Sequence, residues 1–276
     1  MADAAQLAKD SDIAIVFGPD FETEGADRAS IALPEEQDEM ITAVVSANRR
    51  NVVVLNTGCM VLVSRWVDAA PAIVQGWYPG QDDGNVIADV LFGNVNPSGK
   101  LPITFPRVRQ DTGISTAEQY PGVNGLGHYS EGVFVGYRHF DKNNISPQFA
   151  FGHGLSYTTF EYSNIKVSRN RLKAGESLAV EVQVKNTGRR EGAEVVQLYI
   201  QDIQASVPRP LKELKGFEKV TLRPGQMKVV RMTLDTRSMA FYDAARKQWV
   251  VEPGQFKILV GSSSRDIRLN AEFEVS

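Results

Sequence analysis

NVVVLN at residues 51–56 decides the first half of the fold, because an apolar run of this length has the pattern of a buried strand. Two further runs of strand length flank it, DIAIVF at 12–17 and AIVQGW at 72–77. Stretches with helical periodicity follow the strands. Strands that alternate with helices are typical of a parallel sheet with helices on its faces. We therefore predict a partial parallel α/β sheet in the first hundred residues.

Three helices are expected around these strands. In residues 34–47, apolar side chains recur at helical spacing: Met40, Ile41, Val44 and Val45. Pro34 suits the first turn of this helix, where its missing N–H has no helical partner to lose. Residues 61–69 and 84–92 are predicted as the other two helices, and Gly93 is well placed to end the last one.

From about residue 160 the hydrophobic period changes to two, which indicates half-buried strands. The clearest alternating runs are 178–184, 195–200, 229–234 and 256–260. Turn signals separate these runs: Asn-Thr-Gly at 186–188 and Pro-Gly at 224–225 and 253–254. This pattern predicts an antiparallel β-sandwich of fibronectin type III appearance.

The segment between the two patterns is rich in Gly, Asn and Tyr and is longer than a plain connector, so it is either a functional loop or a wrapping segment. The expected division is an α/β domain at 1–107, an inter-domain loop segment at 108–147 and a β-sandwich at 148–276. The predicted fold class is therefore α/β plus all-β.

Charge and composition exclude several classes of partner. The formal net charge is -3, and the first 107 residues carry 15 acidic and 7 basic side chains, which leaves +5 for the remainder. Without a basic stripe, this asymmetry predicts no nucleic-acid partner. No apolar run approaches the roughly 20 residues that span a bilayer, so no membrane partner is expected. The opening residues do not have the pattern of a signal peptide, and the compartment is not predicted.

Metal ions and cofactors are not expected. Cys59 is the single cysteine, and it is predicted to be a small apolar residue beside a strand end. The three histidines, His128, His139 and His153, are scattered and lack the spacing of metal ligands.

Four segments, in this order, resemble glycoside hydrolase family 3 enzymes of the β-glucosidase type. They are ETEGADRASIALPEEQ (22–37), WYPGQDDGNVIADVLFGNVNPSGKLPITFP (77–106), SEGVFVGYRHFD (130–141) and FAFGHGLSYTTFEY (149–162). The resemblance covers nearly the whole chain. It identifies residues 1–107 as the second half of that family's α/β sandwich domain and the last part of the chain as its fibronectin type III-like domain.

The resemblance implies retaining hydrolysis of terminal β-linked sugars, with an Asp nucleophile on a preceding barrel domain and a Glu acid/base on the α/β sandwich domain. The Glu directly before Gly-x-Asp-Arg is Glu24, which is therefore the expected catalytic residue. Independently, Glu24 follows the strand at 12–17, and ligands of open α/β sheets collect beyond the carboxyl ends of strands. The alternative is that Glu24 is a solvated loop carboxylate.

No segment resembles the barrel, its Asp motif or the first half of the sandwich domain. One carboxyl group cannot both attack the sugar and protonate the leaving oxygen. We therefore expect the isolated chain to be inactive, with the nucleophile on a barrel domain that these residues do not contain. The chain is either a truncated product or one chain of a split enzyme that has a barrel-domain partner chain. An incomplete parallel sheet should also expose an apolar edge or face, which predicts self-association.

Residues next to Glu24 are candidates for supporting roles. Glu22 would lie on the same side of an extended segment as Glu24, where its charge would favour the protonated form that a general acid needs. The alternative for Glu22 is an exposed residue without a role. Asp27 and Arg28 are adjacent and oppositely charged, which suits a loop held by ion pairs. Cys59-Met60 departs from the small residue and proline of many relatives, which leaves the shape of that loop open.

The ends of the other strands supply candidate sugar contacts. Asn56, Thr57 and Gly58 follow the second strand, while Trp77, Tyr78 and Gln81 follow the third. Aromatic rings stack on sugar faces, but Trp and Tyr at strand ends are also common core and interface residues. Glu131, together with Tyr137 and Arg138, resembles the family's loop near the active-site entrance, with inter-domain packing as the alternative. Glu22, Trp77, Tyr78 and Glu131 are thus the predicted substrate-binding residues.

Two other functions compete with the hydrolase interpretation. A non-catalytic sugar-binding or protein-interaction module is the alternative, because β-sandwiches of this kind commonly serve adhesion and spacing. Binding of a sugar without turnover would favour it. A small esterase-like hydrolase would need a Gly-x-Ser-x-Gly motif, which the sequence does not contain.

Overall fold

The computed structural model describes residues 1–173 and 175–276. The chain forms two compact units, each with its own packing. The first contains Met1–Val95, Ile103–His128 and Ser146–Phe149, and the second contains Asn96–Pro102, Tyr129–Ile145 and Ala150–Ser276.

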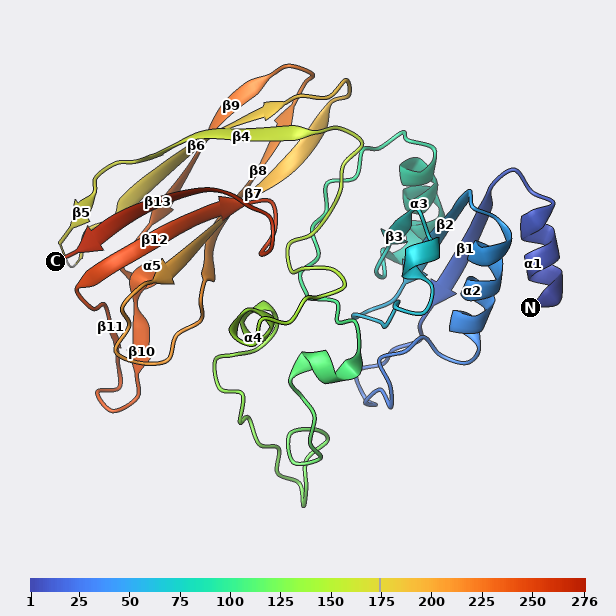
Figure 1. Ribbon diagram of the computed structural model, residues 1–276, viewed down its shortest axis with the longest axis horizontal. Coiled ribbons are helices and arrows are strands. Elements are labelled where there is room, and N and C mark those ends of the chain that lie inside the picture. Colours follow the sequence, from blue (N-terminus) through green and yellow to red (C-terminus); the bar gives the residue numbers. More distant parts are fainter. Residues whose placement is uncertain (174) are drawn as a thin grey trace. The chain divides into compact units, whose positions relative to one another are not determined.

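The first unit is built on a three-stranded parallel sheet in the order β1-β2-β3 (Figure 1). Its elements are α1 (Ala2–Lys9), β1 (Ala14–Pro19), α2 (Gln37–Ala47), β2 (Asn51–Asn56), β3 (Ile73–Gln75), α3 (Asp83–Leu91) and the 3₁₀ turns η1 (Val67–Ala69), η2 (Gly80–Asp82) and η3 (Arg109–Thr112). The predicted parallel sheet is confirmed, with all three strands at the expected places.

Helix α2 packs against β1 and β2 through Ile41, Val44 and Val45, as its apolar stripe predicts. It begins later than the expected residue 34, because Glu35 has a positive φ of 55° that an α-helix does not accommodate. Acidic residues in the first turn, Asp38 among them, suit the positive end of the helix dipole.

The helix predicted at residues 61–69 does not form. Of the described residues in this range, 61–63 have no regular structure, 64–66 form a turn and Val67–Ala69 form the 3₁₀ turn η1. Val61 and Val63 are buried at a period of two, while the amide of Leu62 between them donates a 2.8 Å hydrogen bond to the carbonyl of Ile31. The buried indole of Trp66 donates to Asp38 Oδ1 at 2.8 Å. Tertiary contacts therefore override the helical periodicity here.

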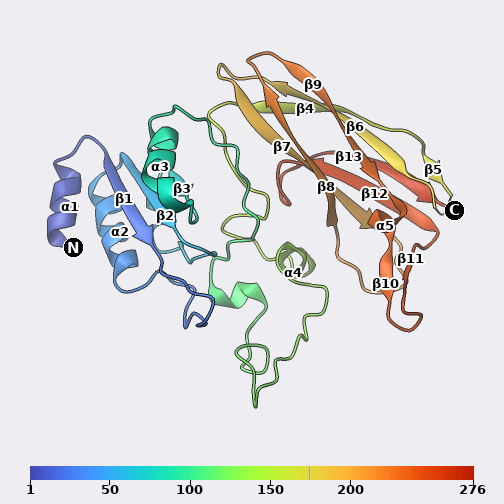
Figure 2. The ribbon, with the colours of Figure 1, turned by 180° about the vertical axis from the view of Figure 1, so that it is seen from behind.

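The second unit is a β-sandwich, seen from opposite sides in Figures 1 and 2. One sheet has the order β5-β13-β12-β7-β8, the other β4-β6-β9, and β10 and β11 form a separate hairpin. The elements are α4 (Tyr137–Lys142), β4 (Phe160–Val167), β5 (Arg171–Leu172), β6 (Leu178–Asn186), β7 (Gly192–Asp202), β8 (Glu213–Leu222), β9 (Met227–Leu234), α5 (Thr236–Met239), β10 (Phe241–Asp243), β11 (Gln248–Val250), β12 (Gly254–Gly261) and β13 (Ile267–Val275).

The sandwich core is formed by the alternating residues that predicted these strands. Val180, Val182 and Val184 of β6 are fully buried, and they belong to one apolar cluster with Ile258 of β12. The predicted fold class is confirmed. Strand β8 was not predicted, because as an edge strand it exposes much of its length and its pairing with β7 is interrupted by a bulge.

Buried ion pairs attach two peripheral segments to the sandwich within the second unit. Lys100 Nζ lies 3.0 Å from a carboxylate oxygen of Glu194, which also accepts a hydrogen bond from the Tyr162 hydroxyl. In α4, Asp141 pairs with Lys212 at 2.5 Å and with Arg265 at 3.1 Å. Each charged group is compensated, as burial requires.

Candidate active site

The carboxyl ends of β1, β2 and β3 lie along one edge of the parallel sheet, as ligand sites of such sheets require. Asp20 directly follows β1, and its amide donates to the carbonyl of Asn56 at the end of β2. Trp77 and Tyr78 follow β3 by two and three residues. The chain thus brings three loops together at this edge.

The loop after β1 folds into a tight turn. Thr23 and Ala26 form an isolated antiparallel bridge, with Glu24 and Gly25 at the tip between them. The prediction of an extended segment with Glu22 and Glu24 on one side is therefore wrong. The Glu24 side chain is exposed, and its carboxylate has no hydrogen bond or ion pair with any residue that the structure describes.

Arg28 organises the base of this turn. Its guanidinium lies 2.6 Å from Asp20 Oδ2 and 3.0 Å from Glu22 Oε1. The same group donates hydrogen bonds to the Cys59 sulfur at 2.6 Å and to the carbonyl of Ala32 at 3.2 Å. The loop is thus held by ion pairs and hydrogen bonds of Arg28, as expected, whereas Asp27 is exposed and takes no part in them.

Cys59 connects the loop after β2 to this cluster. Its thiol donates to Glu22 Oε1 at 3.2 Å. Burial, followed by the hydrogen bond with Glu22, raises the pKa of the Cys59 thiol, so the group remains a neutral donor. Thr57 Oγ1 donates to the carbonyl of Cys59 at 2.9 Å, which fixes the Cys59-Met60 loop. The sequence predicted only a small apolar residue here.

Tyr78 joins the same cluster. Its hydroxyl donates to the carbonyl of Asp20 at 2.8 Å, and its ring remains about half exposed. Partial burial raises the pKa of the Tyr78 phenol, so it stays protonated. Gly58 lies between Tyr78 and Glu22 so closely that a methyl group there would overlap both side chains. The structure therefore brings together two predicted binding residues, Glu22 and Tyr78.

Trp77 is partly buried and packs edge-on against Phe105, with ring centroids 6.5 Å apart. It has a positive φ of 57°, a conformation that costs on the order of 1 kcal/mol for a bulky residue. The carbonyl of Trp77 accepts from Asn56 Nδ2 at 3.4 Å. These contacts favour a packing role over sugar stacking.

Glu131 belongs to the second unit, in the loop before α4. One of its carboxylate oxygens is buried and has no hydrogen-bond partner among residues 1–173 and 175–276. Tyr137 and Arg138, which the resemblance groups with Glu131, make contacts within this unit. The Tyr137 hydroxyl accepts a hydrogen bond from the Leu214 amide at 2.9 Å, and Arg138 pairs with Glu213 at 3.3 Å.

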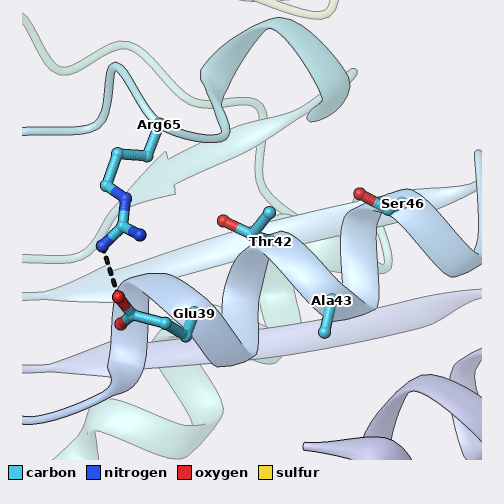
Figure 3. Close-up of a pocket in the computed structure, with 5 residues that line it drawn as sticks. All are labelled: Glu39, Thr42, Ala43, Ser46 and Arg65. Atoms are coloured by element: carbon cyan, nitrogen blue, oxygen red, sulfur yellow. Dashed lines mark hydrogen bonds and ion pairs between the residues drawn. The ribbon is translucent and has the colours of Figure 1, made fainter.

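A separate depression of about 490 Å³ lies on the outer side of α2 (Figure 3). It is lined by short side chains such as Thr42 and Ser46 and closed at one end by the exposed Glu39–Arg65 ion pair. None of the predicted site residues lines it.

Two kinds of feature are absent from the part of the chain that the structure describes. No cluster of three or more His, Cys, Asp or Glu side chains could hold a metal ion. Nor does this part contain a helix with the length and apolar character needed to cross a bilayer.

Comparison with known proteins agrees with the resemblance that the sequence motifs carry. The sequence model of the glycosyl hydrolase family 3 C-terminal domain matches residues 1–157, and that of a fibronectin type III-like domain matches residues 194–264. Thermostable beta-glucosidase B of Acetivibrio thermocellus is 47% identical over 99% of this chain and 36% of its own length. Beta-glucosidase B of Emericella nidulans is 44% identical over 97% of this chain and 33% of its own length.

A solved structure is similar throughout. DesR, a beta-glucosidase from Streptomyces venezuelae crystallised in complex with D-glucose, has a TM-score of 0.95 at 42% identity. The similarity covers 100% of this chain and 35% of that chain. This chain spans only about a third of the length of the curated relatives that it matches. The chain belongs to glycosyl hydrolase family 3, of which it contains the C-terminal domain and the fibronectin type III-like domain.

Proposed function

We propose that this chain supplies the general acid/base, Glu24, for retaining hydrolysis of terminal β-linked sugars. The observation that carries the proposal is the contrast between two neighbouring carboxylates. Glu22 is held by Arg28 and Cys59, whereas Glu24 stands free at the tip of the turn that they anchor. A general acid must come within hydrogen-bond reach of the oxygen that it protonates, and a carboxylate held by internal partners is less free to do so.

Retaining hydrolysis needs a second carboxylate about 5 to 5.5 Å from the first, which attacks the sugar while the acid protonates the leaving oxygen. Glu24 would protonate that oxygen and afterwards take a proton from the water that releases the sugar. We infer that the nucleophile is an Asp of a barrel domain, carried by residues beyond this sequence or by a partner chain. The length of the relatives leaves room for such a domain.

The substrate would be a β-linked glycoside, and the four predicted binding residues divide by role. Tyr78 has an exposed ring that can stack on a sugar next to Glu24's loop. Glu22 acts mainly by fixing Arg28, and Trp77 by supporting the loop after β3. For Glu131, a role in sugar binding rests on the resemblance alone, because the carboxylate oxygen that has no described partner is buried.

The same sheet offers a surface for a partner. Ile15 and Phe17 of β1 each have 46% of their surface exposed and alternate with the buried Ala14 and Val16. A parallel sheet is normally covered on both faces. We infer that this row is covered by a partner domain or, in the isolated chain, by a second copy.

The test is a series of aryl β-glucosides hydrolysed by an assembly of this chain with a barrel domain that carries the nucleophile. Glu24→Gln should slow substrates with poor leaving groups by roughly 10²- to 10⁴-fold, the usual contribution of a positioned general acid. Substrates with activated leaving groups need little protonation, so their first step should change far less. The glycosyl-enzyme should then accumulate, and azide should restore turnover because it needs no base.

Glu22→Gln is the matched control and should show neither leaving-group dependence nor azide rescue. If the two variants exchange these behaviours, Glu22 is the acid/base. The chain alone should release no aryl alcohol, because no glycosyl-enzyme forms without the nucleophile. Turnover by the chain alone would contradict the half-site proposal. Sugar binding without turnover in every assembly would favour the alternative, a non-catalytic sugar-binding or protein-interaction module.

A further inference from the structure

The hairpin β10–β11 of the second unit presents two aromatic rings to solvent. Tyr242 and Trp249 are directly opposite each other in the antiparallel register. Their exposed fractions are 49% and 47%, and their ring centroids are 5.4 Å apart. Aromatic side chains of this size are normally buried in a core or an interface, so an exposed pair on one hairpin is a candidate binding surface.

The hairpin is held in a defined conformation. Asp243 Oδ1 accepts hydrogen bonds from the amides of Ala245 and Arg246 at 2.9 and 3.0 Å, which closes the turn. Glu252, two residues after the end of β11, accepts a hydrogen bond from the amide of Ser206 at 3.0 Å. The aromatic pair is therefore presented by a fixed scaffold, which lowers the entropic cost of binding.

A groove of about 990 Å³ runs beside the hairpin, and both rings line it. Figures 1 and 2 show the hairpin next to α5 from opposite sides. Beneath the groove, Arg209 is almost fully buried between Asp202 and Glu213, at 2.9 and 3.0 Å. The volume is at the upper end of the range for small-molecule sites, so a short oligomer can be accommodated.

The lining selects the chemical class of the ligand. Its charged side chains are five basic and four acidic, so the groove has no strong net charge for a polyanion. A ligand that stacks on the aromatic pair must present an apolar face. The charged side chains at the rim offer hydrogen-bond donors and acceptors for polar groups of the same ligand. A neutral saccharide combines both features. In β-linked glucosyl units the hydroxyl groups are equatorial, so both faces of each ring present C–H groups that stack on aromatic rings.

We propose that this groove is a second saccharide site, which binds a β-linked gluco-oligosaccharide through stacking on Trp249 and Tyr242. Only the choice of β-linked ligand rests on the proposed function. Arg237, an exposed side chain, lies over the Trp249 ring with its guanidinium 3.0 Å from the centroid. A sugar that stacks on this face of the indole therefore displaces the arginine.

Titration of the full chain with cellotetraose, followed by tryptophan fluorescence and calorimetry, tests the site. Trp249 is the most exposed of the three tryptophans, so binding should change its emission. Trp249→Ala should weaken binding at least about tenfold, as loss of a central aromatic anchor does. Tyr242→Ala, followed by calorimetry, should also weaken it, which covers the case in which the tryptophan variant does not fold. The matched control Phe217→Ala removes another exposed aromatic, on β8 outside the groove, and should bind normally.

The outcomes separate this site from the proposed active site. Glu24→Gln should bind cellotetraose at the groove as the unmodified chain does, whether or not Glu24 is the acid/base. Absence of cellotetraose binding, or full binding by the folded Trp249→Ala and Tyr242→Ala variants, would overturn the proposal. So would an equal loss in Phe217→Ala.

Discussion

The guanidinium of Arg28 lies 2.6 Å from Oδ2 of Asp20, and this ion pair closes the base of the loop that carries Glu24. Asp20 is buried at the end of β1, and its Oδ2 accepts no hydrogen bond from the described residues, so it depends on Arg28 for charge compensation. The position of the Glu24 turn relative to the sheet therefore depends on a residue that does not touch Glu24.

Removal of this guanidinium should loosen the loop and the sheet edge. Arg28→Gln leaves the buried Asp20 carboxylate without its ionic partner, and we expect the first unit to lose about 2–3 kcal/mol of unfolding free energy. Hydrogen exchange at the β2 amides measures this loss. Asp27→Asn is the matched control, since Asp27 is exposed, and should change stability by no more than about 0.5 kcal/mol. Equal effects of the two variants would mean that Arg28 is not the anchor.

Gly58 should tolerate no side chain. A methyl group at this position would overlap the Glu22 carboxylate and the Tyr78 ring. Glu22 cannot move away freely because Arg28 and Cys59 hold it. Gly58→Ala should therefore lower the unfolding free energy by roughly 1–3 kcal/mol, as overpacking does.

Urea titration compares Gly58→Ala with Gly25→Ala, at the tip of the Glu24 turn. An added methyl group at Gly25 meets no atom within 4 Å, so that variant should match the unmodified chain. A stable Gly58→Ala protein would show that the cluster adapts.

The strands could be predicted from the sequence because their periodicity reports burial directly. Val180, Val182 and Val184 are buried in the alternation that the pattern gives. Val61 and Val63 alternate as well, yet the run around them was assigned as helix, because extended and helical periods are hard to separate in a short apolar segment. The contact that decides it, between Leu62 and Ile31, is invisible in either segment alone.

The sequence could predict where the candidate site lies, but not which hydrogen bonds and ion pairs join its residues. The carboxyl ends of the strands locate Glu24, Tyr78 and Gly58. The sequence indicates that Arg28 takes part in ion pairs but does not identify its partners, Asp20 and Glu22, which the fold brings to it. Cys59 was assigned to packing, because nothing in the sequence indicates that Arg28 and Glu22 would reach its sulfur.

His153 should make stability depend on pH below neutrality. Burial, and then the nearby Lys100, lower the pKa of His153 in the folded chain below its ordinary value of 6.5. Between 6.5 and the lowered pKa, the unfolded chain binds a proton that the folded chain does not. The stabilisation is therefore complete above pH 6.5 and is lost as the pH falls through this window.

Urea titrations from pH 5 to 8 should show this loss in the unmodified chain and a flatter profile in His153→Asn. His128→Gln removes an exposed histidine and should keep the original profile. A steep profile that persists in His153→Asn would assign the effect to other groups.

The exposed row on β1 should make the isolated chain self-associate. Ile15 and Phe17 project from the same side of an edge strand, and Ile13 just before it is also exposed, at 59%. Removal of such a row from water is favourable by about 25 cal/mol for each Å² of apolar surface, and the open strand edge can pair with a second copy.

Ile15→Lys places a charge within the row, and sedimentation should then show monomer at concentrations where the unmodified chain associates. Leu7→Lys alters an exposed leucine on α1 and should leave association unchanged. A compact monomer of the unmodified chain at high concentration would show that the row does not pair with a second copy.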